Sequence, residues 1–179
     1  MAVPRTKWVE REFSFDLPLG LYACVVERVR GLPARLEDLL RDLPREISTR
    51  RDGGRWSMQE QAGHLLDLED LGLGRLDDFE AGRDTLRAAD MTNRKTHEAD
   101  HNAAPVEEIL GRLRREREEF VRRLDSYDEA FVARAAIHPR LQTRMRVMDL
   151  AYFIAEHDDH HLASVSELVR LFGSRSGGR

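Results

Sequence analysis

The chain has 179 residues, of which 41% are hydrophobic and 35% are charged, and its formal net charge is −4. Arginine and acidic residues alternate along the sequence, so no basic stripe indicates nucleic-acid binding. The longest apolar runs have only a few residues, far short of the roughly 20 that span a bilayer, and the N-terminus lacks the apolar stretch of a signal peptide. We therefore expect a cytoplasmic protein that binds neither nucleic acid nor a membrane. The lone cysteine, Cys24, cannot form an internal disulfide, which agrees with a reducing compartment.

Hydrophobic periodicity divides the chain into three parts. Residues 1–19 contain two prolines and no sustained period, so we expect an irregular N-terminal leader. Residues 20–172 show the spacing of amphipathic helices in several long segments and are expected to form a single helical domain. Residues 173–179 are rich in glycine, serine and arginine, which predicts a flexible tail.

The first predicted helix starts near Gly20 and ends before Pro44. Its inward apolar stripe is continuous, but Pro33 stands inside it. A proline within a helix removes one backbone hydrogen bond and clashes with the preceding turn. We therefore expect a kink or a short break near residues 30–33.

The second predicted helix starts at Ser57. Ser57 and Glu60 have the S-x-x-E spacing of a capping box, in which each side chain accepts a hydrogen bond from the other residue's backbone N–H. The helix is expected to run to a glycine stop at Gly82. His64 shares the face of its inward leucines, so we expect this side chain to point into the interior. Asp67, nearly one turn further on, is a candidate for orienting the His64 imidazole.

A polar connection over residues 83–105 follows. It is longer than an ordinary loop between helices, so we expect a crossover that carries a short helix of its own. His97 and His101 stand at i,i+4 spacing within it. Because their surroundings are polar, we expect them to hydrogen-bond to solvent or loop atoms rather than to bind a second metal.

The third predicted helix runs from Val106 to Tyr127, and most of its arginines pair with glutamates on a solvated face. Arg117 does not fit that face, because it occupies an inward position between Leu113 and Phe120. We consider two interpretations. Arg117 either holds an anionic group of a cofactor or substrate, or extends its charged end to the surface.

The last predicted helix, Met145–Phe172, follows a second connection that contains His138. Because a proline follows His138 and favours an extended conformation before it, we expect His138 in a loop, at a pocket mouth or in a structural hydrogen bond. Within the helix, His157 and His161 occupy successive inward positions where the pattern calls for apolar side chains.

His64, His157 and His161 are thus three inward histidines on two helices. A buried imidazole needs a hydrogen-bonding partner, and a divalent cation would satisfy all three rings at once. The other interpretation is that each ring hydrogen-bonds to a neighbouring helix. His160 lies off the inward face and is expected to act indirectly if at all, and Asp158 is expected on the surface.

Three segments of the sequence resemble the DinB/YfiT-like family of metalloenzymes. They are Gly53-Gly54-Arg55-Trp56-Ser57, His64-Leu65 and Glu156-His157-Asp158-Asp159-His160-His161-Leu162-Ala163. The resemblance extends over residues 21–172 and implies an all-α protein, a four-helix bundle of the DinB/YfiT type with a long crossover connection. It also implies a divalent ion, nickel or zinc, held by His64, His157 and His161, and a homodimer in some members.

The resemblance implies two kinds of chemistry on small molecules, metal-dependent hydrolysis and transfer of a low-molecular-weight thiol. Three neutral imidazoles leave a divalent ion with an open position, which is typical of a catalytic site. A thiol in that position would be activated for transfer, which is the function we prefer at this point. Water there would support hydrolysis instead. A third hypothesis is a non-catalytic helical bundle with a structural metal.

Overall fold

The computed structural model describes residues 3–173. Its helices are α1 (Tyr22–Arg30), α2 (Leu32–Leu40), α3 (Arg45–Ser48), α4 (Met58–Asp67), α5 (Glu69–Glu80), α6 (Arg94–Glu98), α7 (Val106–Ser126), α8 (Glu129–Val132) and α9 (Val147–Phe172). Two strands, β1 (Ala135–His138) and β2 (Thr143–Arg146), precede α9, and short 3₁₀ helices cover Trp8–Glu10, Leu19–Leu21 and His101–Ala103. The tail predicted for residues 173–179 lies outside the described residues from residue 174 onward.

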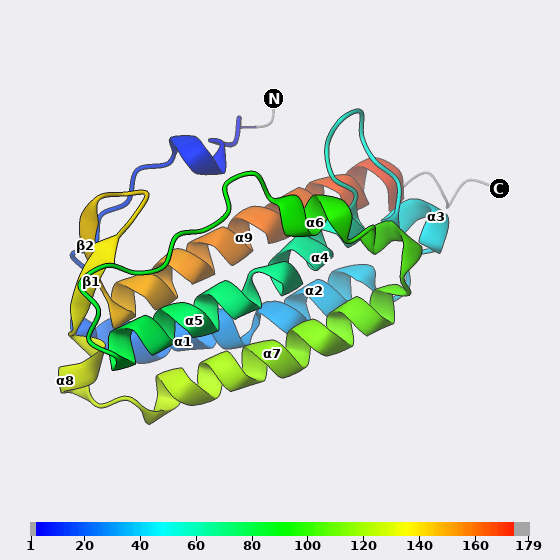
Figure 1. The fold of residues 1–179 in the computed structure, drawn as a ribbon. Helices are drawn as coiled ribbons and strands as arrows, with labels where there is room; N and C mark the ends of the chain where they lie inside the picture. The colour runs from blue at the N-terminus through cyan, green and yellow to red at the C-terminus, as the bar shows by residue number, and fades with distance from the viewer. Residues whose placement is uncertain (1–2, 174–179) are drawn as a thin grey trace.

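Four helical rods build a bundle (Figure 1). They are α1 continued by α2, α4 continued by α5, α7, and α9. The first and last rods run in one direction along the bundle, whereas the α4–α5 rod and α7 run in the other. Because these two middle rods are parallel, the segment between them returns along the length of the bundle, carrying α6 on its way. The predicted four-helix bundle with a long crossover is confirmed.

The first rod changes direction between α1 and α2. Helix α1 ends at Arg30, and the N–H of the next residue, Gly31, still donates to the Glu27 carbonyl at 3.0 Å. Pro33 then lies in the first turn of α2. A proline is tolerated there because the N–H that it lacks would have no partner within the helix. The predicted break near residues 30–33 is confirmed.

The second rod begins with the predicted capping box. The Glu60 N–H donates to Ser57 Oγ at 3.1 Å, and the Ser57 N–H donates to Glu60 Oε2 at 2.8 Å. The rod is not one continuous helix as expected, because α4 and α5 meet at Leu68. There the Leu68 N–H donates to the Leu65 carbonyl at 3.3 Å, which tightens the backbone for one turn.

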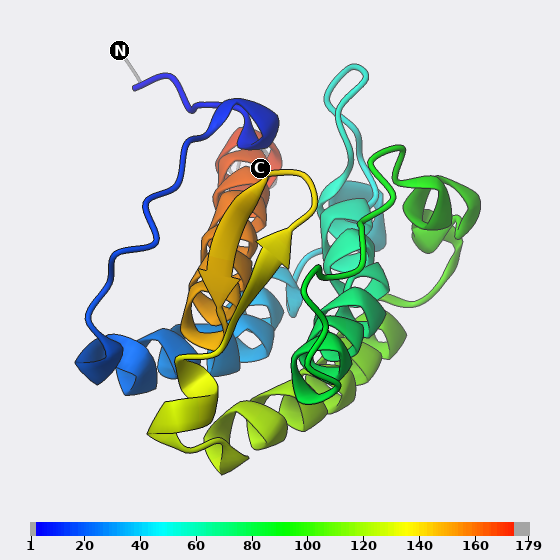
Figure 2. The same cartoon turned by 60° about the vertical axis from the view of Figure 1, so that its left-hand side comes forward.

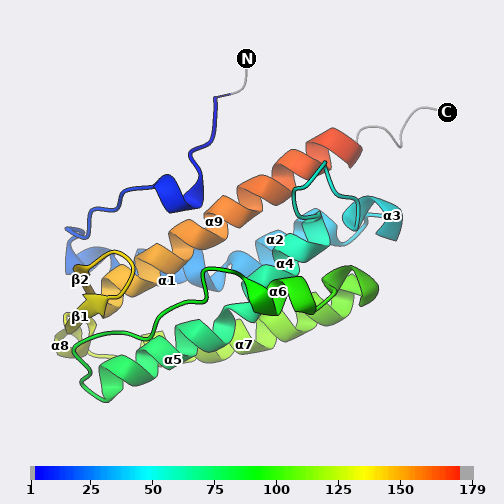
Figure 3. The same cartoon turned by 45° about the horizontal axis from the view of Figure 1, so that its top comes forward.

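The crossover is fastened to the start of α4, beside which it passes in Figure 3. The Gln59 side-chain amide donates to the carbonyl oxygens of His101 and Ala104 at 2.5 and 2.6 Å. The Ser57 hydroxyl donates to Asn102 Oδ1 at 2.8 Å. These bonds hold the 3₁₀ turn of the crossover against the helix that carries His64.

A buried polar layer divides the apolar interior into two clusters. One cluster joins α1, the end of α5, the hairpin and the first part of α9, and the other joins α2, α4, the start of α7 and the end of α9. Between them lie buried polar side chains that include Glu69 on α5, Arg117 on α7 and Asp158 on α9. A buried charge is costly unless it is paired, so the contacts within this layer decide whether the bundle is stable.

Arg117 is 3% exposed and Asp158 is 1% exposed. The arginine donates from Nε and Nη2 to Glu69 Oε1 at 3.0 and 2.6 Å. Its Nη1 donates to Asp158 Oδ2 at 2.5 Å and to the Val29 carbonyl at 3.2 Å, and Nη2 reaches Asp158 Oδ1 at 3.3 Å. The expectations that Arg117 extends to the surface and that Asp158 lies there are wrong, because each charge finds its partner on a neighbouring rod.

The same contacts bear on the interpretation that Arg117 holds an anionic group of a cofactor or substrate. A guanidinium has five N–H donors. In this structure Glu69, Asp158 and the Val29 carbonyl accept from all of them. Arg117 therefore has no donor left for an anionic ligand, and its contacts describe a structural ion pair.

The connection over residues 128–144 contains α8 and most of a β-hairpin, which we did not predict (Figure 2). The strands pair antiparallel, from Ala135 opposite Arg146 to His138 opposite Thr143. His138 therefore ends a strand and does not lie in a loop as expected. The turn that follows lies over the second turn of α9, because the His138 ring is 5.2 Å from the Phe153 ring between centroids and the Arg140 guanidinium is 5.8 Å from the centre of the same ring.

The N-terminal leader lies along the outside of α9 (Figure 1). Trp8 packs against Phe153, with ring centroids 5.0 Å apart, and against His157, with centroids 4.9 Å apart. Arg11 forms an ion pair with Glu156 that ties the leader to the same helix. In residues 3–173, no helix combines the length and the apolar character needed to cross a membrane.

Candidate metal centre

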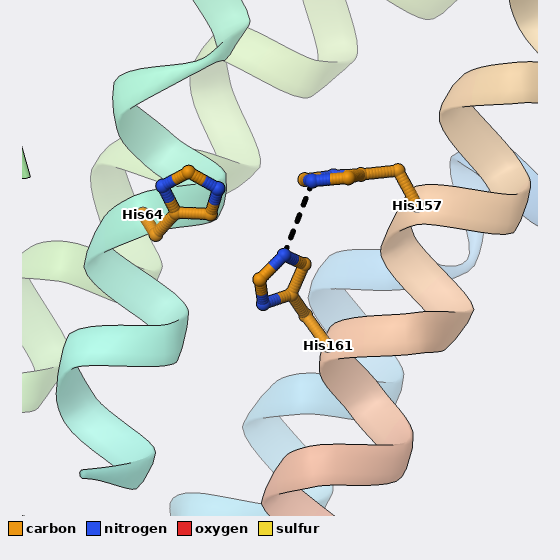
Figure 4. A group of neighbouring side chains, drawn as sticks. All are labelled: His64, His157 and His161. Carbon is orange, nitrogen blue, oxygen red and sulfur yellow. Dashed lines mark hydrogen bonds between the residues drawn. The ribbon is translucent and has the colours of Figure 1, made fainter. Parts of the chain in front are cut away.

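Three histidine rings meet between α4 and α9 (Figure 4). His64 projects from α4, and His157 and His161 project toward it from adjacent turns of α9. One ring nitrogen of each lies within 4.8 Å of the corresponding nitrogens of the other two. The Nε2 atoms of His157 and His161 are 3.1 Å apart. The structure thus brings together the three residues that the sequence analysis selected as metal ligands.

The hydrogen bonds of His64 fix which of its nitrogens carries the proton. His64 Nδ1 lies 3.0 Å from Thr96 Oγ1, which in turn lies 2.8 Å from Asp67 Oδ2. A carboxylate can only accept, so the single hydroxyl proton of Thr96 is donated to Asp67. The hydroxyl must then accept from His64 Nδ1–H. The lone pair of the neutral His64 ring is therefore on Nε2 and is available to a metal ion.

His161 is oriented in the same way. Its Nδ1 lies 2.5 Å from the side-chain carbonyl oxygen of Gln61, which is an acceptor. Nδ1 therefore carries the proton, and the lone pair of Nε2 points toward His157 Nε2. A proton or a cation between the two Nε2 atoms stabilises their separation of 3.1 Å. This arrangement is what a shared metal ion requires.

The electrostatics of the site keep the rings neutral. Burial lowers the pKa of His64 to about 4. Burial also holds the pKa values of His157 and His161 well below the ordinary value, and the neighbouring rings add to the effect because two imidazolium charges repel each other. All three rings are consequently neutral near pH 7, which is the state that binds a metal ion.

The donor set fits a borderline divalent ion. Zinc–nitrogen distances of about 2.0–2.1 Å in tetrahedral geometry place two ligand nitrogens about 3.3 Å apart. The 3.1 Å between His157 and His161 is close to that spacing. Three neutral imidazoles occupy three positions of such an ion and leave at least one open, as in catalytic sites.

Behind His64 lies a chain of polar groups that ends at His101. Asp67 Oδ2, which accepts from Thr96, is also 2.8 Å from His101 Nε2. His101 is 8% exposed and packs directly on Gly63, where a Cβ atom would stand 2.2 Å from its ring. The expectation that His101 bonds to solvent or loop atoms is wrong, because Gly63 opens a space in which it reaches the end of α4.

The remaining histidines lie outside the cluster. His97 is exposed beside Trp56, with ring centroids 5.6 Å apart. His160 is half-buried, and its ring centroid is 5.5 Å from that of His161. His138 lies across the cavity described next.

A cavity of about 530 Å³ adjoins the histidines. Its walls come from α5, α9, the leader, the crossover and the turn of the hairpin, and they are mainly apolar. Two indole rings flank the cluster, with Trp8 4.9 Å from His157 and Trp56 4.8 Å from His64 between centroids. The three histidines therefore line a space large enough for a small organic molecule.

A sequence model of the DinB superfamily matches residues 28–165. The chain belongs to the DinB superfamily. The match includes α4, all three histidines and the first two-thirds of α9. A search of curated proteins gives no significant match.

One solved structure has the same fold as this chain. It is YfiT from Bacillus subtilis, described as "a probable metal-dependent hydrolase with an unusual four-helix bundle topology". The TM-score is 0.77, with 20% sequence identity over 92% of this chain and 94% of that one. At this level of identity the comparison establishes the shared bundle topology of a DinB-superfamily protein, and the chemistry of this chain has to be argued from its own residues.

Two residues that orient the histidines escaped the sequence analysis. Gln61 precedes His64 by three residues and shares its face of α4, so helical spacing could have indicated it. Thr96 gave no such signal, because it lies on α6 in the crossover, and only the folded chain places it beside His64. Asp67, considered as a residue that orients His64, does so through Thr96.

The hydroxyl of Thr96 provides a test of this arrangement. Thr96→Val keeps the shape of the side chain but leaves His64 Nδ1–H without its acceptor, so we expect metal affinity to fall by about 10–100-fold. Competition with a chromophoric chelator measures this. Thr92→Val is the matched control, since the Thr92 hydroxyl is exposed and donates to Asp90. Equal affinities in the two variants would contradict the orienting role of Thr96.

Proposed function

We propose that the protein is a divalent-metal-dependent hydrolase of small organic molecules, with His64, His157 and His161 as the metal ligands. One observation carries the proposal: three neutral imidazoles bring one ring nitrogen each to within 4.8 Å of one another at the wall of an apolar cavity. The description of YfiT as a probable metal-dependent hydrolase supports it.

Each residue of the site would have a defined task. Nε2 of His64, His157 and His161 would hold the ion. When bound, the ion would act as a Lewis acid and lower the pKa of a water molecule toward neutrality. Thr96 and Gln61 keep the Nδ1 protons in place, so that two of the rings do not change tautomer. Trp8 and Trp56 narrow the access of bulk water to the ligands.

Transfer of a low-molecular-weight thiol, the function that the sequence analysis preferred, needs the same three ligands and stays a prediction. So do the identity of the ion as nickel or zinc, the homodimer and the cytoplasmic location. The cavity favours catalysis over a purely structural metal, because a structural ion is enclosed by four protein ligands and needs no adjoining space for a substrate.

Metal content and activity of the purified protein test the proposal together. The protein is purified without added metal, analysed for its elements, stripped with a chelator and reloaded with zinc or nickel. Loaded protein is assayed with small esters, amides and lactones, with and without added thiols. We expect hydrolysis that is lost on stripping, returns on reloading, and is absent in His161→Ala.

The outcomes separate the hypotheses. Turnover that requires a thiol would replace the hydrolase proposal with the transferase. Stoichiometric metal without any turnover, together with a metal whose coordination excludes solvent, would support the non-catalytic bundle. Protein that retains no divalent ion after reloading would refute a metal-dependent function altogether.

A further inference from the structure

The part of the cavity wall formed by the hairpin and by α5 carries a second group of polar side chains. His138 ends β1, Arg140 lies in the turn that follows, and Arg75 projects from α5. All three line the cavity that adjoins the metal ligands. None of them is part of the metal centre, so they need an explanation of their own.

His138 presents an unused hydrogen-bond donor. It is 2% exposed, and its Nδ1 accepts from the Leu141 backbone N–H at 3.2 Å. Nδ1 therefore carries the lone pair and Nε2 carries the proton of the neutral ring. This Nε2 is buried and has no hydrogen-bond partner among residues 3–173. A buried donor left without an acceptor costs about 1–3 kcal/mol, so an acceptor placed in the cavity beside Nε2 would be stabilised.

Two arginines beside His138 also lack anionic partners. Arg140 Nη2 is buried without a hydrogen bond, and its guanidinium stands 5.8 Å from the ring centre of Phe153. Arg75 is 4% exposed, and its Nε donates to the Arg87 carbonyl at 3.2 Å. Within residues 3–173, neither guanidinium forms an ion pair with a carboxylate.

The local potential is correspondingly positive. Burial lowers the pKa of Arg75 to about 10; the charge of Asp78 opposes this shift, and the smaller individual effects of Arg140 and Arg87 add to it. Burial, followed by the charges of Arg75 and Arg140, lowers the pKa of His138 to about 4. Each carboxylate of the cavity wall is already engaged: Glu69 and Asp158 pair with Arg117, and Asp90 accepts from the backbone N–H groups of Thr92 and Arg94.

We propose that Arg75, Arg140 and His138 Nε2–H form a binding subsite for an anionic oxygen group, a carboxylate or a phosphate, of the molecule that occupies the cavity. Three residues that line one cavity, and whose side chains there can only donate, match an acceptor with several lone pairs. That the bound molecule is a substrate rests on the proposed function. That the subsite binds an anion does not depend on that function.

The cavity wall between the three donors and the clustered histidines indicates the shape and polarity of the remainder of the bound molecule. Phe153 lies 5.2 Å from His138 and 5.0 Å from Trp8 between ring centroids, and Trp8 lies 4.9 Å from His157. Two aromatic rings thus line the path from the donor cluster to the metal ligands. The occupant is an elongated small molecule with an apolar middle, an anionic group at the arginines and its reactive group at the histidines.

Binding to metal-free protein tests the subsite apart from catalysis. Calorimetric titrations use hexanoate, hexanamide and pentyl phosphate, in the presence of a chelator. We expect at least about tenfold tighter binding of hexanoate or pentyl phosphate than of hexanamide, because only an anion neutralises the two guanidinium groups. Whichever anion binds more tightly identifies the group. Equal binding of all three probes would overturn the proposal without any need for a variant.

Two variants locate the effect. Arg140→Gln and Arg75→Gln are each expected to lower anion affinity by about tenfold while leaving hexanamide affinity within about twofold. Arg144→Gln is the control, because Arg144 is exposed on β2 and the variant removes the same charge from the same hairpin. An anion preference that survives both test variants would contradict the assignment. A protein that prefers anions but hydrolyses nothing would retain this subsite and lose the proposed function.

Discussion

Replacing Arg117 with methionine is expected to lower the free energy of unfolding by about 3–5 kcal/mol. The guanidinium is the only cation that contacts the buried carboxylates of Glu69 and Asp158 among the described residues. Its removal leaves two negative charges inside the bundle without hydrogen-bond donors. Urea denaturation of the metal-free protein, in the presence of a chelator, measures the loss.

The expected loss of stability depends on the burial of the arginine, and a matched variant at an exposed arginine tests this. Arg112→Met removes the same charge from the same helix, but the Arg112 side chain is 53% exposed and stands 3.6 Å from Glu116. An exposed pair of this kind contributes at most about 1 kcal/mol. If the two variants lose similar amounts of stability, the buried ion pair does not hold the rods together as argued here.

The loss should also depend on pH in a defined direction. Burial raises the pKa of Glu69, and Arg117 opposes that rise. Without Arg117 the folded-state pKa lies further above the unfolded value, so the folded state keeps a proton that the unfolded state releases. The variant therefore loses stability relative to the wild type as the pH rises above the ordinary pKa of a glutamate.

Adding zinc or nickel to metal-free protein is expected to raise the free energy of unfolding by about 2.7 kcal/mol when free metal is about 100 times the dissociation constant. The gain arises because His64, His157 and His161 are close together only in the folded chain. His161→Ala should abolish it, since two imidazoles on different helices hold an ion far less well than three. Thermal and urea unfolding, with and without metal, give the difference.

The neighbouring histidine supplies the control for this second prediction. His160→Ala changes the adjacent residue, whose ring lies outside the cluster that could hold an ion. It should keep the full gain on adding metal. For each variant, the rise in the free energy of unfolding on adding metal is compared, rather than the free energy itself. The packing cost of the substitution is then subtracted out. A gain that persists in His161→Ala would show that the ion binds elsewhere.

Local patterns predicted the helices and the histidine cluster. The i,i+4 spacing of His157 and His161, at positions where the helical pattern calls for apolar residues, indicated two inward imidazoles on one face. The capping box at Ser57 fixed the start of α4 and hence the face on which His64 lies. These features depend on residues only a few positions apart in the chain. They can therefore be predicted from the sequence without a structure.

Features that depend on distant segments could not be predicted in this way. The pattern placed Arg117 inward, but its partners lie 48 and 41 residues away on other rods. Thr96 meets His64 across 32 residues, through a crossover whose path no local pattern specifies. The hairpin was missed because each strand has only four residues, too few for a clear alternation.

The cavity wall is built partly from the bundle rods and partly from the segments that connect them. The three clustered histidines sit on rods held by the buried ion pairs, whereas much of the opposite wall comes from the leader, the crossover and the hairpin turn. Substitutions in these connecting segments can alter which molecule is accommodated while the ligand-bearing helices stay in place. Such a division allows substrate preference to diverge among relatives at little cost to folding, and it makes the same three segments the natural targets for redesigning selectivity.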